Sequence, residues 1–162
     1  MINFTSHNLE DTKSLAKILA KVIQPGSLIL LSGPLGSGKT AFTQAFGRSL
    51  GIDRAIKSPT YTIVKEYELQ QVAERVVHID AYRLEEGGAD TVDFDLFFDR
   101  QSICLVEWPQ FITDYLPKSH IEIAFKLLDQ NQRQIEISLS PQADNKHQII
   151  FQKFRDHIER GD

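Results

Sequence analysis

Eight consecutive residues have the spacing of a phosphate-binding loop. Residues 33–40 read Gly-Pro-Leu-Gly-Ser-Gly-Lys-Thr, which fits the pattern G-x-x-x-x-G-K-[ST]. The three glycines allow the backbone to bend until its N–H groups face a single anion. In such a loop the Lys39 amine reaches the outer phosphates, and the Thr40 hydroxyl can hold a magnesium ion. The alternative interpretation is a glycine-rich turn that binds nothing.

Two carboxylates follow short apolar runs further along the chain. Residues 76–79 are rich in β-formers and precede Asp80, and residues 103–106 precede Glu107. In open α/β sheets, ligands bind beyond the carboxyl ends of the strands, so both acids are expected to face the phosphate loop. One of them would hold magnesium and the other would position the attacking water, and the spacing does not say which. For His78, filling the core is the simpler expectation than chemistry. Trp108 could lie against a base, but packing is again the simpler expectation.

The residues on either side of the loop predict the strand and the helix that it needs. Residues 28–31 are a short apolar run typical of a buried strand, and apolar residues at helical spacing follow the loop up to Gly51. The helix start adds its dipole to the anion site. Strand, glycine loop and helix therefore come in the order that phosphate binding requires.

The rest of the chain predicts two further helices, two strand pairs and an edge strand. Asn8, with Asp11 three positions later, marks a helix start, and Pro25-Gly26 ends that helix. Residues 2–5 are a candidate edge strand. Residues 60–69 are expected to pair with 75–79, residues 121–125 with 135–139 in an antiparallel hairpin, and residues 147–160 to form a terminal helix.

The segment Ser58-Pro59-Thr60-Tyr61-Thr62 has two interpretations. Its hydroxyl groups could order a loop around a bound phosphate, as in a nucleotide-sensing switch. The spacing alone favours a simpler role as the lead-in to the strand that follows.

Composition excludes several classes of protein. The chain has 162 residues, 41% hydrophobic and 25% charged, with a formal net charge of -4. One soluble domain is expected over residues 1–162, without the global basic field that would attract nucleic acid or anionic lipid. The single Cys104 lies in an apolar run, which suits core packing in a reducing cytosol. We find neither a secretion signal nor an apolar run of membrane-spanning length, so a cytoplasmic location is expected.

Acidic residues are concentrated between the two strands that end in carboxylates. Phenylalanines and Leu96 are interleaved with them. A solvated surface is the simpler interpretation, and a docking face for a basic partner is the more specific one. The acidic residues are Glu85, Glu86, Asp90, Asp93, Asp95 and Asp99.

Four segments in the same order resemble one known family. They are residues 33–40, residues 57–62 (Lys-Ser-Pro-Thr-Tyr-Thr), residues 78–84 (His-Ile-Asp-Ala-Tyr-Arg-Leu) and residues 103–109 (Ile-Cys-Leu-Val-Glu-Trp-Pro). Together they resemble the TsaE (YjeE-type) ATPases of bacterial tRNA threonylcarbamoyladenosine synthesis. The four segments span about half of the chain, and their combination is far more specific than a lone phosphate loop.

The resemblance implies a fold, a cofactor and a set of site residues. It implies an α/β P-loop NTPase fold, a single three-layer domain whose mixed, mainly parallel sheet carries antiparallel hairpins, with ATP and Mg²⁺ bound. It implies that Thr40 and Glu107 hold the metal, with Asp80 as the second catalytic carboxylate beside Lys39. Ser58, Thr60, Tyr61 and Thr62 would be the switch. The implied nucleotide-binding residues are Thr12, Gly33, Leu35, Gly36, Ser37, Gly38, Lys39, Thr40, Ala41 and Arg133.

The resemblance also implies partners. Proteins of this family act with TsaD and TsaB, which transfer a threonylcarbamoyl group to the adenosine beside the tRNA anticodon, so contact with tRNA would be indirect. Two departures stand out. Family members usually carry an acid where this chain has Pro34, and the acidic segment 85–99 differs in detail from theirs.

Three functions remain open at this stage. The first is a partner-dependent ATPase with weak activity alone, because no arginine finger stands out. The second is a small-molecule kinase with Asp80 and Arg83 at an acceptor site, although no basic lid follows Trp108. The third is an interaction module that keeps the loop only as structure. A GTPase is disfavoured because an N-K-x-D segment is missing; residues 145–148 lack the aspartate.

Overall fold

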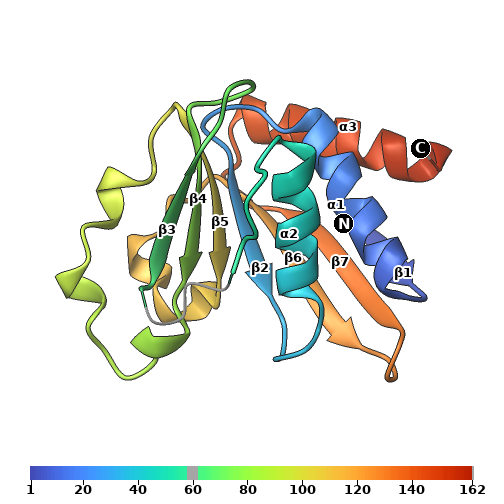
Figure 1. Ribbon diagram of the computed structural model, residues 1–162, viewed down its shortest axis with the longest axis horizontal. Helices are drawn as coiled ribbons and strands as arrows, with labels where there is room; N and C mark the ends of the chain where they lie inside the picture. Colours follow the sequence, from blue (N-terminus) through green and yellow to red (C-terminus); the bar gives the residue numbers. More distant parts are fainter. Residues whose placement is uncertain (58–61, 162) are drawn as a thin grey trace.

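The computed structural model describes residues 1–57 and 62–161, in which three helices accompany a seven-stranded sheet (Figure 1). Along the sheet the strand order is β1-β7-β6-β2-β5-β4-β3. The strands are β1 Ile2–Ser6, β2 Leu28–Ser32, β3 Val64–Glu68, β4 Arg75–Asp80, β5 Ser102–Glu107, β6 Ile121–Leu127 and β7 Arg133–Leu139. The helices are α1 Leu9–Val22, α2 Lys39–Ser49 and α3 Asn145–Arg160.

The elements predicted from the sequence are confirmed, with small shifts at their ends. The Asn8 side chain caps α1 by accepting a hydrogen bond from the Asp11 amide at 2.9 Å, as the sequence predicts. In the hairpin turn, Asp129 Oδ1 accepts two backbone amides at 2.8 Å. Residues 60 and 61 of the strand predicted over 60–69 lie outside the described residues. In the described part the strand begins at Val64, because Ile63 has a positive φ of 66° that breaks the extended backbone.

Strand direction explains where the candidate site lies. The central strands β6, β2, β5 and β4 are mutually parallel. Antiparallel pairing occurs at the two sides of the sheet, between β3 and β4 on one side and along β6, β7 and β1 on the other. The carboxyl ends of β2, β5 and β4 therefore meet at one edge of the sheet, which is the lower edge in Figure 1.

The two faces of the sheet are covered differently. All three α-helices pack on one face, where Leu19 of α1, Phe46 of α2 and Phe154 of α3 are buried in a single core with Leu31 of β2. A second, smaller core on the other face is closed by short 3₁₀ helices around Leu84, Phe94 and Ile112. The predicted third layer thus consists of 3₁₀ turns rather than α-helices.

Cys104 lies in this second core, as expected. Its thiol donates to the Phe97 carbonyl, and burial raises the pKa of the thiol to about 12. It is therefore an unreactive packing residue.

Candidate functional site

The phosphate loop connects the end of β2 to the start of α2. Gly33, Gly36 and Gly38 have φ values of 141°, 76° and 107°, which are left-handed values that side chains disfavour. Gly38 is the N-cap of α2, and no side chain caps the helix there. The first amides of α2 are thus left for a ligand, and the positive end of the helix dipole favours an anion.

The base of the loop tolerates no side chain. A Cβ placed on Gly33 would lie 2.6 Å from the Phe125 carbonyl oxygen, on the neighbouring strand β6. Pro34 lies just beyond, and its carbonyl accepts the Ser37 amide at 3.2 Å in a tight turn. Proline at this position is therefore compatible with the turn.

Lys39 lies in a largely buried position at the mouth of the loop. Its Nζ donates to the Gly33 carbonyl at 2.6 Å and lies 3.9 Å from the centre of the Trp108 ring. Burial lowers the pKa of the Lys39 amine, and the charges of Glu107 and Asp80 act in the opposite direction. A further negative group beside this amine would favour its charged form.

Both predicted carboxylates lie beside Lys39. Asp80 and Glu107 end the adjacent parallel strands β4 and β5 and are paired in register. Both are buried, at 3% exposure. They line a cavity of about 480 Å³ together with Lys39 and Thr40. The strand ends thus bring together a lysine, a hydroxyl and two acids that are spread over residues 39–107 of the sequence.

The remaining predicted nucleotide-binding residues divide into two groups. Leu35, Gly36, Gly38 and Ala41 line the same cavity. Gly33 and Ser37 do not line it: the Ser37 hydroxyl is fully buried and has no hydrogen-bond partner among the described residues.

Thr12 and Arg133 reach the loop from outside the cavity. The Thr12 methyl group lies 3.6 Å from the position of a Cβ on Gly38, and its hydroxyl contacts Ser6 Oγ at 2.7 Å. Arg133 Nε donates to the Ser37 carbonyl at 3.1 Å, and another guanidinium nitrogen donates to the Gly36 carbonyl at 3.2 Å. The arginine predicted to contact nucleotide therefore holds the loop backbone.

Most of the predicted switch lies outside the described residues. This applies to Ser58, Thr60 and Tyr61. Thr62 is described and exposed, and its carbonyl accepts the Val64 amide at 2.7 Å.

Three residues in or beside the cavity were not predicted to belong to the site: Tyr82, Trp108 and His78. Tyr82 lines the cavity, and its ring lies 5.1 Å from that of Trp108, which itself stacks on Phe111. His78 Nε2 lies 2.7 Å from Glu107 Oε2, with both side chains almost fully buried. Strand alternation was the available signal for His78, because residues 78 and 80 lie on the same face of β4.

The donor set fits a magnesium ion bound to a polyphosphate. A hydroxyl and two carboxylates are hard oxygen donors, and magnesium in such sites takes one or two carboxylates plus phosphate oxygens and water. Among residues 1–57 and 62–161, His, Cys, Asp and Glu form no group of three that would hold a metal by itself.

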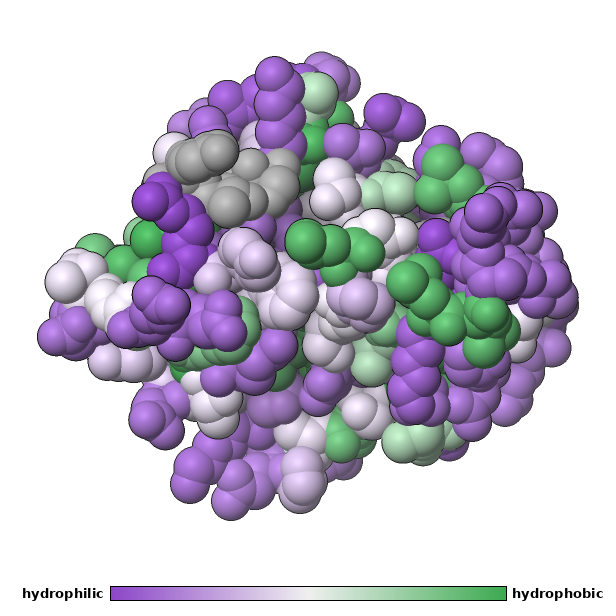
Figure 2. Space-filling model, turned by 90° about the horizontal axis from the view of Figure 1, so that it is seen from below, coloured by the Kyte–Doolittle hydropathy of each residue, from purple (hydrophilic) through white to green (hydrophobic). Residues whose placement is uncertain are grey.

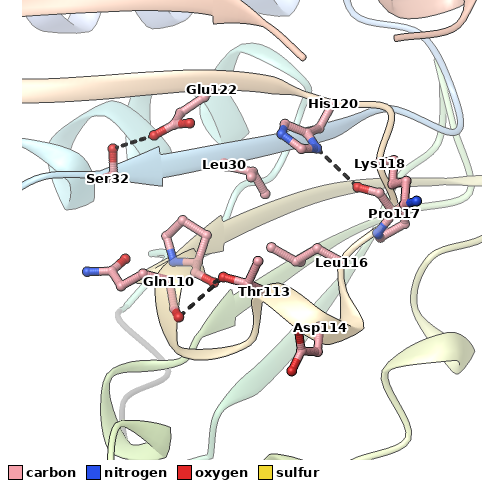
Figure 3. A pocket seen from close by; sticks show the side chains of 11 residues that line it. Leu30, Ser32, Gln110, Thr113, Asp114, Leu116, Pro117, Lys118, His120 and Glu122 are labelled. Atoms are coloured by element: carbon pink, nitrogen blue, oxygen red, sulfur yellow. Dashed lines mark hydrogen bonds between the residues drawn. The ribbon is translucent and has the colours of Figure 1, made fainter. Parts of the chain in front are cut away.

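Another cavity, of about 610 Å³, lies on the opposite face of the sheet and is distinct from the candidate site (Figure 3). Leu30 and Leu116 line its apolar part, and Ser32 donates to Glu122 at 3.1 Å along one wall. It shares no lining residue with the cavity around Lys39.

The acidic segment 85–99 is only partly available as a surface. Asp99 lies 2.8 Å from Arg75, which also pairs with Glu66, so Asp99 belongs to the packing around β4. Phe94, between the exposed Asp93 and Asp95, is buried, whereas Leu96, directly after Asp95, is 64% exposed.

Comparisons with known proteins agree with this geometry. Residues 6–135 match the family model described as threonylcarbamoyl adenosine biosynthesis protein TsaE. The chain is 36% identical to the TsaE protein of Bacillus subtilis (strain 168) over 93% of this chain and 91% of that protein. It is 34% identical to the TsaE protein of Aquifex aeolicus (strain VF5) over 79% of this chain and 89% of that protein.

A solved structure extends the likeness to the fold. The crystal structure of Bacillus subtilis YdiB superposes with a TM-score of 0.80 at 32% identity, covering 97% of this chain and 95% of that one. The fold is that of a P-loop NTPase. With the phosphate loop, the two carboxylates and the family match in agreement, the chain belongs to the TsaE family of tRNA threonylcarbamoyladenosine biosynthesis.

Proposed function

We propose that this protein binds ATP with Mg²⁺ and hydrolyses it weakly until partners complete the site. In this proposal its hydrolysis supports repeated turnover of a TsaD–TsaB complex that modifies tRNA, in the cytoplasm. The observation that carries the proposal is the cavity in which Lys39, Thr40, Asp80 and Glu107 meet at the N-terminus of α2.

Each residue has a defined task in the proposed reaction. The loop amides and Lys39 would bind the phosphates and neutralise their charge. Thr40 and Glu107 would hold the magnesium ion, which supplies electrostatic stabilisation of charge on the transferred phosphoryl group. Asp80 would orient the attacking water. Its Oδ1 already accepts the Tyr82 amide at 3.0 Å, which helps to hold the carboxylate in place.

Dependence on a partner follows from the charges around the cavity. Lys39 is the one basic side chain among the described residues that line it. Phosphoryl transfer to water is commonly accelerated by an arginine supplied within the protein or by a partner. A partner that donates such a group would raise a low basal rate.

The decisive experiment measures ATP hydrolysis by the purified protein with and without the TsaD–TsaB pair, using Lys39→Ala as the control. We expect slow hydrolysis alone, clear stimulation by the pair and loss of both with Lys39→Ala. Rapid hydrolysis that partners leave unchanged would contradict the proposal. The kinase alternative is tested with γ-labelled ATP in the same mixtures, because transfer of label to a metabolite instead of release as phosphate would favour it.

A further inference from the structure

The buried contact between His78 and Glu107 has a role beyond packing. We propose that His78 is a positioning residue: its imidazole fixes the Glu107 carboxylate so that the carboxylate can serve the magnesium ion. This inference rests on the proposed function, because it concerns the metal that would accompany ATP.

The geometry assigns the hydrogen bond a direction. An ionised carboxylate can only accept, so His78 Nε2 carries the proton and donates it to Glu107 Oε2 across 2.7 Å. The contact joins the neighbouring strands β4 and β5, and the exposures of the two side chains are 1% and 4%. One carboxylate oxygen is thus committed to the imidazole, which leaves Oε1 to serve the metal ion or a bound water.

The other imidazole nitrogen argues against a purely structural role. With the proton on Nε2, Nδ1 is a hydrogen-bond acceptor, and it is buried without a partner among residues 1–57 and 62–161. Leaving a buried polar atom unpaired is unfavourable. An aliphatic side chain, like those of Val76 and Ile79 in the same strand, would avoid that cost but would leave Glu107 without its donor.

A carboxylate at this place needs such a donor. Glu107 is buried and lies beside Lys39, whose amine lies against the Trp108 ring. Without His78, the carboxylate is free to rotate toward the Lys39 ammonium and satisfy its charge there. Groups that hold metal-binding carboxylates in place typically change metal affinity by about 10- to 100-fold when they are removed.

Substituting His78 by each of the two amide residues distinguishes a positioning role from a purely structural one. The Gln side chain places its Nε2 near the position of His Nε2, whereas the shorter Asn side chain places its Nδ2 near His Nδ1 and falls short of Glu107. The test measures ATP affinity of the wild type, His78→Gln and His78→Asn, each with Mg²⁺ and with EDTA. It also measures Mn²⁺ binding to the ATP complex by electron paramagnetic resonance.

We expect His78→Asn to weaken Mn²⁺ binding about 10-fold or more and to remove most of the gain in ATP affinity that Mg²⁺ provides, while affinity in EDTA is unchanged. We expect His78→Gln to keep wild-type Mn²⁺ binding and the wild-type gain in ATP affinity with Mg²⁺. Equal Mn²⁺ binding by the wild type and His78→Asn overturns the positioning role. The role is also overturned if His78→Asn loses the same ATP affinity with Mg²⁺ as with EDTA. If instead the wild type gains nothing from Mg²⁺, the proposed function itself fails.

A measurement on the wild-type protein is independent of the folding of the variants. Long-range ¹H–¹⁵N spectra of the imidazole report which nitrogen carries the proton. We expect the Nε2–H form for His78 and a shift of that resonance when Mg²⁺ joins the ATP complex. An Nδ1–H form, or a resonance that Mg²⁺ leaves unmoved, overturns the proposal.

Discussion

At the scale of single residues, close approaches of the backbone decide which positions accept substitution. Gly33 combines a φ of 141° with a carbonyl oxygen 2.6 Å from its missing Cβ. Gly87 has a similar φ of 124°, but nothing lies within 4 Å of the position of its Cβ. Substitutions at the two glycines therefore distinguish the cost of backbone strain from the cost of a collision with the neighbouring strand.

We predict that Gly33→Ala lowers the free energy of unfolding by about 3 kcal/mol or more, since strain and a clash with Phe125 are combined. Gly87→Ala carries only the strain, and we expect a loss of about 1 to 2 kcal/mol. Denaturant titration of both variants without nucleotide is the measurement. Equal losses would show that the contact with β6 is not what requires glycine at position 33.

At the scale of secondary-structure elements, the β6–β7 hairpin supports the phosphate loop. Arg133 begins β7, and its guanidinium donates both to the loop carbonyls of Gly36 and Ser37 and to the carbonyls of the hairpin turn. These contacts join segments 96 residues apart. Arg133 thus holds the loop backbone although it does not line the cavity.

Arg133→Gln should weaken ATP binding by about 1 kcal/mol, or roughly fivefold in dissociation constant, because the loop loses charge-assisted support. Lys126→Gln is the matched control, since Lys126 lies on the same hairpin and pairs with Glu136 at 2.9 Å, away from the loop. Isothermal titration calorimetry measures both. Unchanged affinity in the Arg133 variant would mean that the loop keeps its shape without the arginine.

Helix α3 is linked to β2 through a buried histidine. His147 Nε2 accepts the Leu28 amide at 3.0 Å, and Nδ1 lies 2.8 Å from Asp144 Oδ1. Burial lowers the pKa of His147 below its usual 6.5, although Asp144 acts in the opposite direction. Protonation at Nε2 would break the contact with Leu28.

This shift predicts a loss of stability in acid. Because the unfolded chain takes up the proton first, the free energy of unfolding should fall as the pH drops below about 6.5 and through the lower pKa of the folded protein. His147→Gln keeps an acceptor for the Leu28 amide but does not titrate. Urea unfolding at a series of pH values should therefore show that the free energy of unfolding falls less steeply in acid for the variant than for the wild type. Equal slopes would show that His147 does not cause the loss of stability.

At the scale of the whole molecule, the surface near the phosphate loop is mainly polar. Figure 2 views the end of the molecule where β2 runs into the loop, and apolar side chains lie there in small separate groups among polar ones. In Figure 1 the yellow-green acidic segment loops out beyond the β3 edge of the sheet. No helix in the described part of the chain has the length and apolar character needed to cross a membrane.

The acidic segment remains a predicted docking face, now reduced to its exposed members. Charge reversal of Asp93 and Asp95 to lysine should lower stimulation of ATP hydrolysis by TsaD–TsaB about 10-fold, chiefly by slowing association. Basal hydrolysis should be unchanged. Glu10→Lys with Glu159→Lys is the control, because it changes the same charge on the exposed sides of α1 and α3. Equal stimulation of both double variants would exclude Asp93 and Asp95 as docking contacts.

Many local features of this structure could be predicted from patterns of residues close together in the sequence. The strand, glycine loop and helix around Lys39, the cap at Asn8 and the hairpin turn at Asp129 each depend on residues within a few positions of one another. Backbone conformation at that range is set by local sterics and hydrogen bonds. The sequence also indicated that Asp80 and Glu107 end strands, because each follows a run of β-forming residues.

The tertiary structure alone decided which of these segments meet. Parallel pairing of β4 with β5 brings His78 and Asp80 beside Glu107, and the position of β7 brings Arg133 beneath the loop. The 3₁₀ turns that cover the second face of the sheet have no periodic signal of their own. Strand order and register depend on contacts between residues far apart in the chain, and one sequence read locally does not contain that information.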